Sequence, residues 1–507
     1  MNKPLKITRL NLTFLRKNIE IISYITTAIG TLIGVLLLFF GVTSYNYNLM
    51  LSGVLVIWCT HIIFGFFNVK QRFVLLIFNC TIFLFLLSRA TVAAFRGESW
   101  WYNYSVDANI CALILISLSI IFISIGALLF EKLIKCKKNS SASPKNKRFC
   151  LDRESLVLIV RLGLAICMIC FFIREADKLL FMSGKEYASY YTEYKCNLPF
   201  LIQFPAGCMK YFLCMFLALK PSKIESFIWL GINVVSTLPM LKIGARGNFI
   251  LSIIFAFVYY CLRSISGKNW FGKLEKIAII VCIPLMIISM GAYNYTRDDK
   301  EVKISAGELV VDFLYKQGTT YDTVLQGYTY QDKLPGKDSK NYTFSAVTDT
   351  VLYNSLGKRI FNAPEITDGN SLRTAYRSHS FSHAISYAVL GADYIGGKGR
   401  GSSYIIENYI DFGYAGCIVF SLLLGVVCSA SVILFGKKWL GSVIILNILL
   451  DLFFTPRAES LSSVTFLFSY KFWFITLAVV IASMIAKIII DKLNLKKFTF
   501  FNWILKI

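Results

Sequence analysis

The stretch "ANICALILISLSIIFISIGALLF" (residues 108–130) decides the fold class, because none of its residues carries a charge. About 20 predominantly apolar residues form a helix that is long enough to cross the hydrocarbon core of a membrane. The chain of 507 residues is 56% hydrophobic and only 16% charged. A soluble protein of this length would show amphipathic periods between its charges. We therefore predict an all-α polytopic membrane protein.

Apolar runs of this kind recur along the chain and predict about 12 transmembrane helices. They lie near residues 20–41, 48–67, 72–88, 108–130, 155–173, 198–219, 226–241, 248–262, 276–293, 412–435, 439–455 and 463–486. This spacing divides the chain into three parts. Residues 1–293 hold the first nine spans, residues 294–411 form one large loop, and residues 412–507 hold the last three spans.

The net charge of +24 would also suit a nucleic-acid-binding protein, but the basic residues lie where membrane topology explains them. They gather before the first span, in "EKLIKCKKNSSASPKNKRFCLDRE" (131–154) after the fourth span, and after the last span. Basic loops of polytopic proteins face the cytoplasm. We therefore expect both termini to be cytoplasmic, and we expect no nucleic-acid partner.

On this topology the loop 294–411 lies on the outer side of the membrane and is too long to be a passive connector. Its segment "SAGELVVDFLYKQGTTYDTVLQGY" (305–328) has the apolar spacing of helices, with a break at a glycine. The segment "SLRTAYRSHSFSHAISYAVLG" (371–391) has polar residues at spacings of three and four. As one helix it would bring the following residues near one face: Arg373, Tyr376, Arg377, Ser380 and His383. The loop is therefore predicted to be partly helical.

Three arginines stand at the predicted outer edge of the membrane, where the orientation rule disfavours them. They are Arg246 in "IGARGN" (243–248), Arg400 in "GKGRGSSYIIENYIDFGYAG" (397–416) and Arg457 in "TPRAES" (455–460). Guanidinium groups bind a diphosphate through paired, charge-assisted hydrogen bonds. We interpret these arginines, with Arg377 of the loop, as candidate diphosphate ligands. The alternative is that each pairs with a lipid phosphate.

A few charged residues fall inside apolar spans and need a partner or water. Lys210 and Asp451 are candidates for a pair with each other, and Arg161 is expected to extend its charge towards the inner membrane surface. We interpret these residues as structural, or as lining a cavity.

The layout and the three arginine motifs resemble the O-antigen polymerases of the Wzy family, which are oligosaccharide repeat-unit polymerases. The resemblance covers the whole chain as a layout, whereas the motifs are short. It implies a glycosyltransferase in the bacterial inner membrane that builds lipopolysaccharide from units carried on undecaprenyl diphosphate. It also implies a glycan transfer at the periplasmic face. Expected partners are the lipid-linked oligosaccharide and inner-membrane lipids, with a chain-length regulator and a flippase as further candidates.

Such a reaction requires a base for the attacking hydroxyl and stabilisation of charge on the leaving diphosphate. Glu407 is one candidate base, because Tyr404, Asn408 and Asp411 would share its helical face. His379 and His383 compete for the role, since imidazole titrates near neutral pH. The alternative for Glu407 is an interfacial carboxylate paired with a cation. For the histidines the alternative is packing or sugar hydrogen bonding.

Two other classes of function stay open. An O-antigen ligase shares the layout and the leaving group, and only the acceptor differs. A lipid-linked oligosaccharide flippase or transporter would more typically show repeated halves and short loops. We expect neither a metal nor a cofactor, because the chain has three histidines and its acidic residues form no ligand motif.

Overall fold

The structure is a computed structural model that describes most of the chain. It covers residues 9–139, 152–242, 246–277 and 305–492, with a few isolated residues between 284 and 291, and leaves out positions 102, 186, 268–269, 274, 364–365 and 367–368. The predicted span 276–293 falls almost entirely outside the described residues. The side chain of Arg246 also lies outside them.

The described part of the chain is 82% helical and holds no strand, which confirms the all-α class. Within it, 11 helices are long and apolar enough to cross a membrane. They are Asn18–Thr43, Tyr47–Phe66, Val69–Phe95, Val106–Cys136, Arg153–Phe181, Phe200–Ala218, Lys223–Leu241, Gly247–Ile265, Tyr404–Leu434, Trp439–Arg457 and Tyr470–Lys492. The protein is therefore polytopic, as its apolar runs predict.

The chain forms two compact units, each built from separate stretches of sequence. Unit 1 comprises Met1–Cys136, Ile280–Thr329 and Asn408–Ile433. Unit 2 comprises Lys137–Ile279, Tyr330–Glu407 and Leu434–Ile507.

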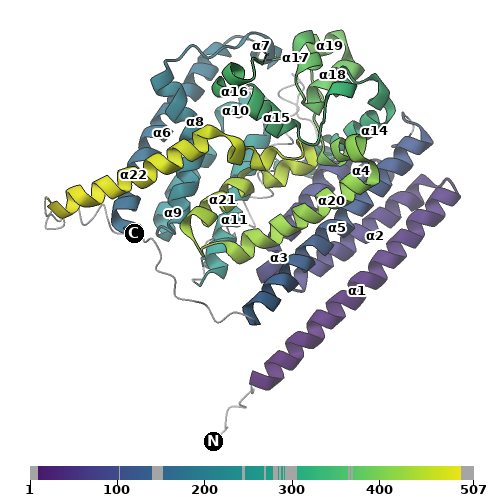
Figure 1. The fold of residues 1–507 in the computed structure, drawn as a ribbon. Coiled ribbons are helices and arrows are strands. Elements are labelled where there is room, and N and C mark those ends of the chain that lie inside the picture. The colour runs from purple at the N-terminus through teal and green to yellow at the C-terminus, as the bar shows by residue number, and fades with distance from the viewer. Residues whose placement is uncertain are drawn as a thin grey trace, which may run out of the picture. The chain divides into compact units, whose positions relative to one another are not determined.

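Unit 1 is a set of long apolar helices, of which α1 and α2 run side by side (Figure 1). Its elements are α1 (Arg9–Thr43), α2 (Tyr47–Phe66), α3 (Val69–Ile82), a π-helical turn η1 (Phe83–Leu87), α4 (Ser88–Phe95), α5 (Val106–Asn139), α13 (Ala306–Gln317), α14 (Thr320–Tyr330) and most of α20 (Tyr404–Leu434). Glycine lets α5 and α20 approach closely, since a Cβ at Gly425 would lie 1.9 Å from the Ile123 carbonyl oxygen. Arg72 and Glu131 form a buried ion pair in this unit, with Arg72 Nη2 2.9 Å from Glu131 Oε2.

Unit 2 carries the shorter helices of the segment 330–407 on a second set of apolar helices. Its elements are α6 (Arg153–Phe181), α7 (Tyr187–Glu193), α8 (Phe200–Ala218), α9 (Lys223–Ser236), α10 (Pro239–Lys242), α11 (Arg246–Ile265), η2 (Gln331–Lys333), η3 (Lys337–Ser339), α15 (Ser345–Leu352), α16 (Ser355–Ile360), α17 (Leu372–Arg377), α18 (Phe381–Leu390), α19 (Ala392–Ile395), α21 (Trp439–Asp451), η4 (Leu452–Arg457), η5 (Ser462–Phe468) and α22 (Tyr470–Lys492).

Two of the charged residues inside the apolar helices of unit 2 have a charged partner. Lys210 Nζ lies 3.7 Å from Asp451 Oδ1, which confirms that these two residues partner each other. Arg161 forms an ion pair with Glu225, so a carboxylate on α9 neutralises its charge. Such pairing removes most of the penalty for a charge at membrane depth.

Several predicted boundaries differ from the structure, including the following two. The predicted span 72–88 continues as helix to Phe95, so the connection that follows it is shorter than expected. The predicted span 463–486 begins in the 3-10 segment η5, and its α-helix begins only at Tyr470. The first error arises because apolar composition does not mark where a helix ends, and the second arises because it does not distinguish types of helix. The predicted pair of helices over 305–328 is confirmed as α13 and α14, with the break at Gly318.

Candidate active site

The segment 371–391 folds as two helices, so the single helical face predicted for it is wrong. Helix α17 ends at Arg377, Ser378 adopts an extended backbone, and α18 begins at Phe381. The cause is a competing set of hydrogen bonds, because Ser378 Oγ donates to Asp349 Oδ2 over 2.6 Å. Serine side chains offer the backbone such alternatives to helix. The break leaves His379 between the two helices.

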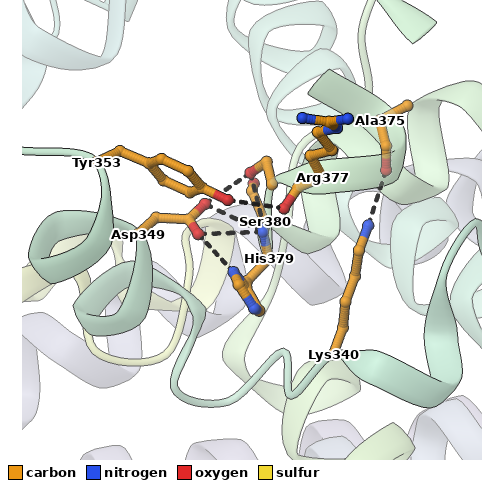
Figure 2. A network of polar contacts seen from close by, with 8 residues as sticks. Lys340, Asp349, Tyr353, Ala375, Arg377, His379 and Ser380 are labelled. Atoms are coloured by element: carbon orange, nitrogen blue, oxygen red, sulfur yellow. Dashed lines mark hydrogen bonds and ion pairs between the residues drawn. The ribbon is translucent and has the colours of Figure 1, made fainter. Parts of the chain in front are cut away.

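Asp349 of α15 holds His379 in one orientation, as Figure 2 shows. Its Oδ1 lies 2.8 Å from His379 Nδ1, and both carboxylate oxygens lie 3.1 Å from the His379 backbone nitrogen. A carboxylate can only accept from a ring N–H, so a neutral imidazole carries its hydrogen on Nδ1 and its lone pair on Nε2. Within the described residues, Nε2 has no hydrogen-bond partner. The His379 side chain is 20% exposed.

Lys340 lies close enough to the same carboxylate for the two charges to interact, and no sequence pattern singles it out. Its Nζ donates to the Ala375 carbonyl oxygen over 2.8 Å (Figure 2). Burial lowers the pKa of the Lys340 ammonium to about 8, although the charge of Asp349 acts in the opposite direction. His379 and Asp349, here called the dyad, therefore have a neighbouring lysine with a pKa of about 8.

His383, the second candidate histidine, contacts a tyrosine instead of a carboxylate. Its Nδ1 lies 2.9 Å from the Tyr394 hydroxyl oxygen, and the side chain is half-buried. Burial lowers the pKa of His383, the charge of Asp349 raises it, and the charge of Lys340 lowers it. The contact joins α18 to α19, which precedes the glycine-rich segment 396–401. This geometry favours the packing interpretation of His383.

Glu407 is fully buried, with 0% of its surface exposed. Its Oε1 accepts from Ser402 Oγ, and its Oε2 accepts from the Ser460 nitrogen at 2.7 Å and from Ser460 Oγ at 2.8 Å. Ile405 and Ile406 are as buried as Glu407, so this helix start is enclosed on both of its faces. The carboxylate therefore fastens the start of α20 to the turn 455–460.

That turn brings a second carboxylate, Glu459, towards the dyad. Glu459 is half-buried and close enough to Glu407 for their charges to interact. Burial raises the pKa of Glu459, the nearby Ser380 hydroxyl lowers it, and the charge of Asp349 raises it further. Glu459 stands in the motif "TPRAES", where sequence reasoning selected only the arginine. The signal that could have found it is an acidic residue in a short turn between two apolar spans.

The chain segments that carry the three candidate diphosphate arginines come together within unit 2. A Cβ at Gly401, next to Arg400, would lie 3.9 Å from the Arg457 carbonyl oxygen. Similarly, a Cβ at Gly247, next to Arg246, would lie 3.3 Å from the Phe454 ring in η4. The Arg400 side chain is exposed, and its backbone nitrogen donates to Ser386 Oγ over 2.7 Å.

Arg377 behaves differently from the other candidate ligands. Its side chain is exposed and points away from Asp349 in Figure 2. Only its backbone joins the network, since its carbonyl oxygen accepts from the Tyr353 hydroxyl over 3.1 Å. The structure therefore places Arg377 at the edge of the dyad, whereas the other three arginine segments form a group of their own.

The sequence matches one known family along nearly its full length. A family model described as O-antigen polysaccharide polymerase Wzy covers residues 19–488. The chain belongs to this family. No match was found among curated proteins or among solved structures. Wzy polymerases act on lipid-linked oligosaccharide repeat units in the membrane, which makes this protein a polysaccharide polymerase with glycosyltransferase-type activity.

Proposed function

We propose that this Wzy polymerase joins repeat units carried on undecaprenyl diphosphate, at the periplasmic face of the inner membrane, with His379 as the general base. The observation that carries the proposal is the 2.8 Å contact between His379 Nδ1 and Asp349 Oδ1. A base oriented by a carboxylate, with its second nitrogen accessible, is the arrangement that proton abstraction requires. In this proposal both termini lie in the cytoplasm.

The reaction needs one proton transfer and one substitution at carbon. The acceptor sugar hydroxyl attacks the anomeric carbon of the donor glycan, and the bond from that carbon to the diphosphate oxygen breaks. The hydroxyl proton passes to His379 Nε2, and the electron pair of the broken bond leaves with the diphosphate. Asp349 stabilises the resulting imidazolium, because its carboxylate accepts the Nδ1–H bond throughout.

The leaving diphosphate requires positive charge and hydrogen-bond donors. The segments of Arg246, Arg400 and Arg457 supply them in this proposal, and the glycines around Arg400 let backbone amides approach phosphate oxygens. The close passage of Gly401 beside Arg457 supports a shared site for at least these two segments. Metal independence is part of the proposal, because arginines can provide the charge stabilisation that a metal provides elsewhere.

A deletion strain tests the proposal. Lipopolysaccharide from this strain should carry a single repeat unit on its core, and a plasmid copy of the wild-type gene should restore the ladder. The His379→Ala variant should fail to restore it, whereas Asp393→Asn should restore it, because Asp393 is an exposed partner of Lys398 outside the dyad. Core without any repeat unit would indicate a ligase or a flippase, and an unchanged ladder would contradict the proposal.

A further inference from the structure

Unit 1 contains a polar, aromatic cavity that the proposed reaction does not use. Its volume is about 140 Å³, and it lies between α4, the segment 96–105 that follows it, and the pair α13 and α14. The residues that matter for its chemistry are Arg89, Glu98, Trp100, Asn103, Tyr315 and Asp322. The cavity therefore combines two stretches of sequence that lie more than 200 residues apart.

Close backbone contacts fix the two sides of the cavity against each other. Ser88 Oγ donates to the Leu314 carbonyl oxygen over 2.7 Å. A Cβ at Gly318 would lie 2.4 Å from the Arg89 nitrogen, so only glycine permits this approach between α4 and the turn from α13 to α14. The Arg89 side chain extends from α4 to the other side of the cavity. Its Nη1 lies 3.2 Å from Asp322 Oδ2, and its guanidinium lies 4.6 Å from the centre of the Tyr315 ring.

The aromatic wall of the cavity is also held in place. Trp100 Nε1 donates to Asn48 Oδ1 over 3.2 Å, and its ring meets Tyr321 edge-on at 5.9 Å. The Tyr104 hydroxyl accepts from Gln326 Nε2 over 3.1 Å. The flat surfaces are therefore positioned before any ligand arrives, which reduces the entropy lost on binding.

The charges of the lining exclude one obvious ligand. Arg89 is balanced by Asp322, and Glu98 adds a further negative charge, so the cavity is poorly suited to the lipid diphosphate. Carboxylates, a guanidinium and an amide next to aromatic rings instead suit a neutral group with several hydroxyls and an apolar ring face. The volume is well below the roughly 300–1,000 Å³ of sites for drug-sized ligands, so one ring fits and a longer chain does not.

We propose that this cavity binds a single neutral sugar residue of the glycan, at a site separate from the His379 dyad. The inference rests on the proposed function, since that function supplies the glycan. Asp322, Glu98 and Asn103 hydrogen-bond the sugar hydroxyls, and Trp100 contacts the ring face. The site acts by binding alone and takes no part in the proton transfer.

Calorimetry on the purified full-length protein in detergent tests this proposal. The probe is the lipid-free oligosaccharide released by mild acid from the O antigen of the bacterium that carries the gene. The wild type should bind it, and both Asp322→Asn and Trp100→Ala should weaken binding about tenfold or more, because each removes a charged hydrogen bond or a ring contact. Asp312→Asn and Trp101→Ala are the matched controls, since neither residue lines the cavity. Both controls should bind as the wild type does.

The outcomes separate this inference from the proposed function. If the wild type does not bind the oligosaccharide, or if Asp322→Asn binds it with unchanged affinity, the sugar site is wrong even though the ladder still depends on the gene. Binding of inorganic diphosphate that Arg89→Gln abolishes would contradict the charge argument. If deleting the gene leaves the ladder intact, the proposed function fails whatever calorimetry finds. Should Trp100→Ala aggregate on size-exclusion chromatography, Asp322→Asn alone decides.

Discussion

Replacing Asp349 with asparagine tests the dyad while almost preserving the size of the side chain. The carboxylate accepts from Ser378 Oγ at 2.6 Å, from the His379 backbone nitrogen at 3.1 Å and from His379 Nδ1 at 2.8 Å. Asparagine has a single acceptor oxygen, and its amide group carries two hydrogens that would face one of these donors. The variant therefore loses the charge that stabilises a protonated His379.

The size of the effect follows from the geometry. A hydrogen bond to a charged group contributes about 1.5–3 kcal/mol, and each 1.36 kcal/mol of barrier changes the rate about tenfold. We therefore expect Asp349→Asn to lower kcat by roughly 10- to 150-fold. The KM should change by less than about threefold, because Asp349 acts through His379 and does not touch the substrate.

The assay follows the formation of polymer from purified lipid-linked repeat units by the detergent-solubilised protein. His379→Ala should slow it about 10²–10⁴-fold, as the loss of a general base typically does. The double variant should be no slower than His379→Ala alone, since two groups that act as a unit are not additive. Asp393→Asn is the control, and thermal melting establishes that each variant is folded. An unchanged rate for Asp349→Asn, or losses that multiply in the double variant, would refute the dyad.

Arg400→Lys keeps the charge but loses the paired hydrogen bonds, so polymerisation in the lipopolysaccharide ladder should fall clearly at normal expression. Glu407→Gln should lower the melting temperature, by about 1 °C for each kcal/mol lost in a chain of this length, with a rate within about tenfold of the wild type. A rate about 10²–10⁴-fold slower at an unchanged melting temperature would instead identify Glu407 as the base. Because burial lowers the pKa of Lys340 to about 8, the rate of its acylation should rise with pH with a midpoint near pH 8. Peptide mass spectrometry can follow this rate, with the exposed Lys398 as the reference. A midpoint near pH 10.4, the pKa of a free lysine, would contradict the burial argument. Polymerisation should proceed in EDTA, and activity that Mg²⁺ or Mn²⁺ restores would overturn metal independence.

The apolar helices could be predicted because each one is a local pattern of sufficient length. The pair Lys210 and Asp451 could be predicted for a chemical reason, since a charge inside an apolar span has few acceptable partners. Each inference needs only the residue types around one position, and a single sequence shows these directly.

The dyad could not be predicted in the same way. Asp349 lies 30 residues before His379, in the helix "SAVTDTVL", and no local period joins the two. The break in 371–391 was missed because the 3–4 spacing of its polar residues suits a continuous helix. A usable signal was present in the serines on both sides of His379, because serine favours the ends of helices over their interiors.

The buried carboxylate of Glu407 also restricts how this gene can recombine with its relatives. Two of its three hydrogen bonds come from Ser460, 53 residues further along the chain. A chimera that exchanged the loop and the start of α20 without the turn 455–460 would bury either a carboxylate without donors or donors without an acceptor. Removing one partner of a buried charged contact typically costs about 3–5 kcal/mol, which is a large part of the stability of a protein. We therefore expect functional exchanges of substrate-handling loops to carry both segments together, and positions 407 and 460 to vary jointly among related sequences.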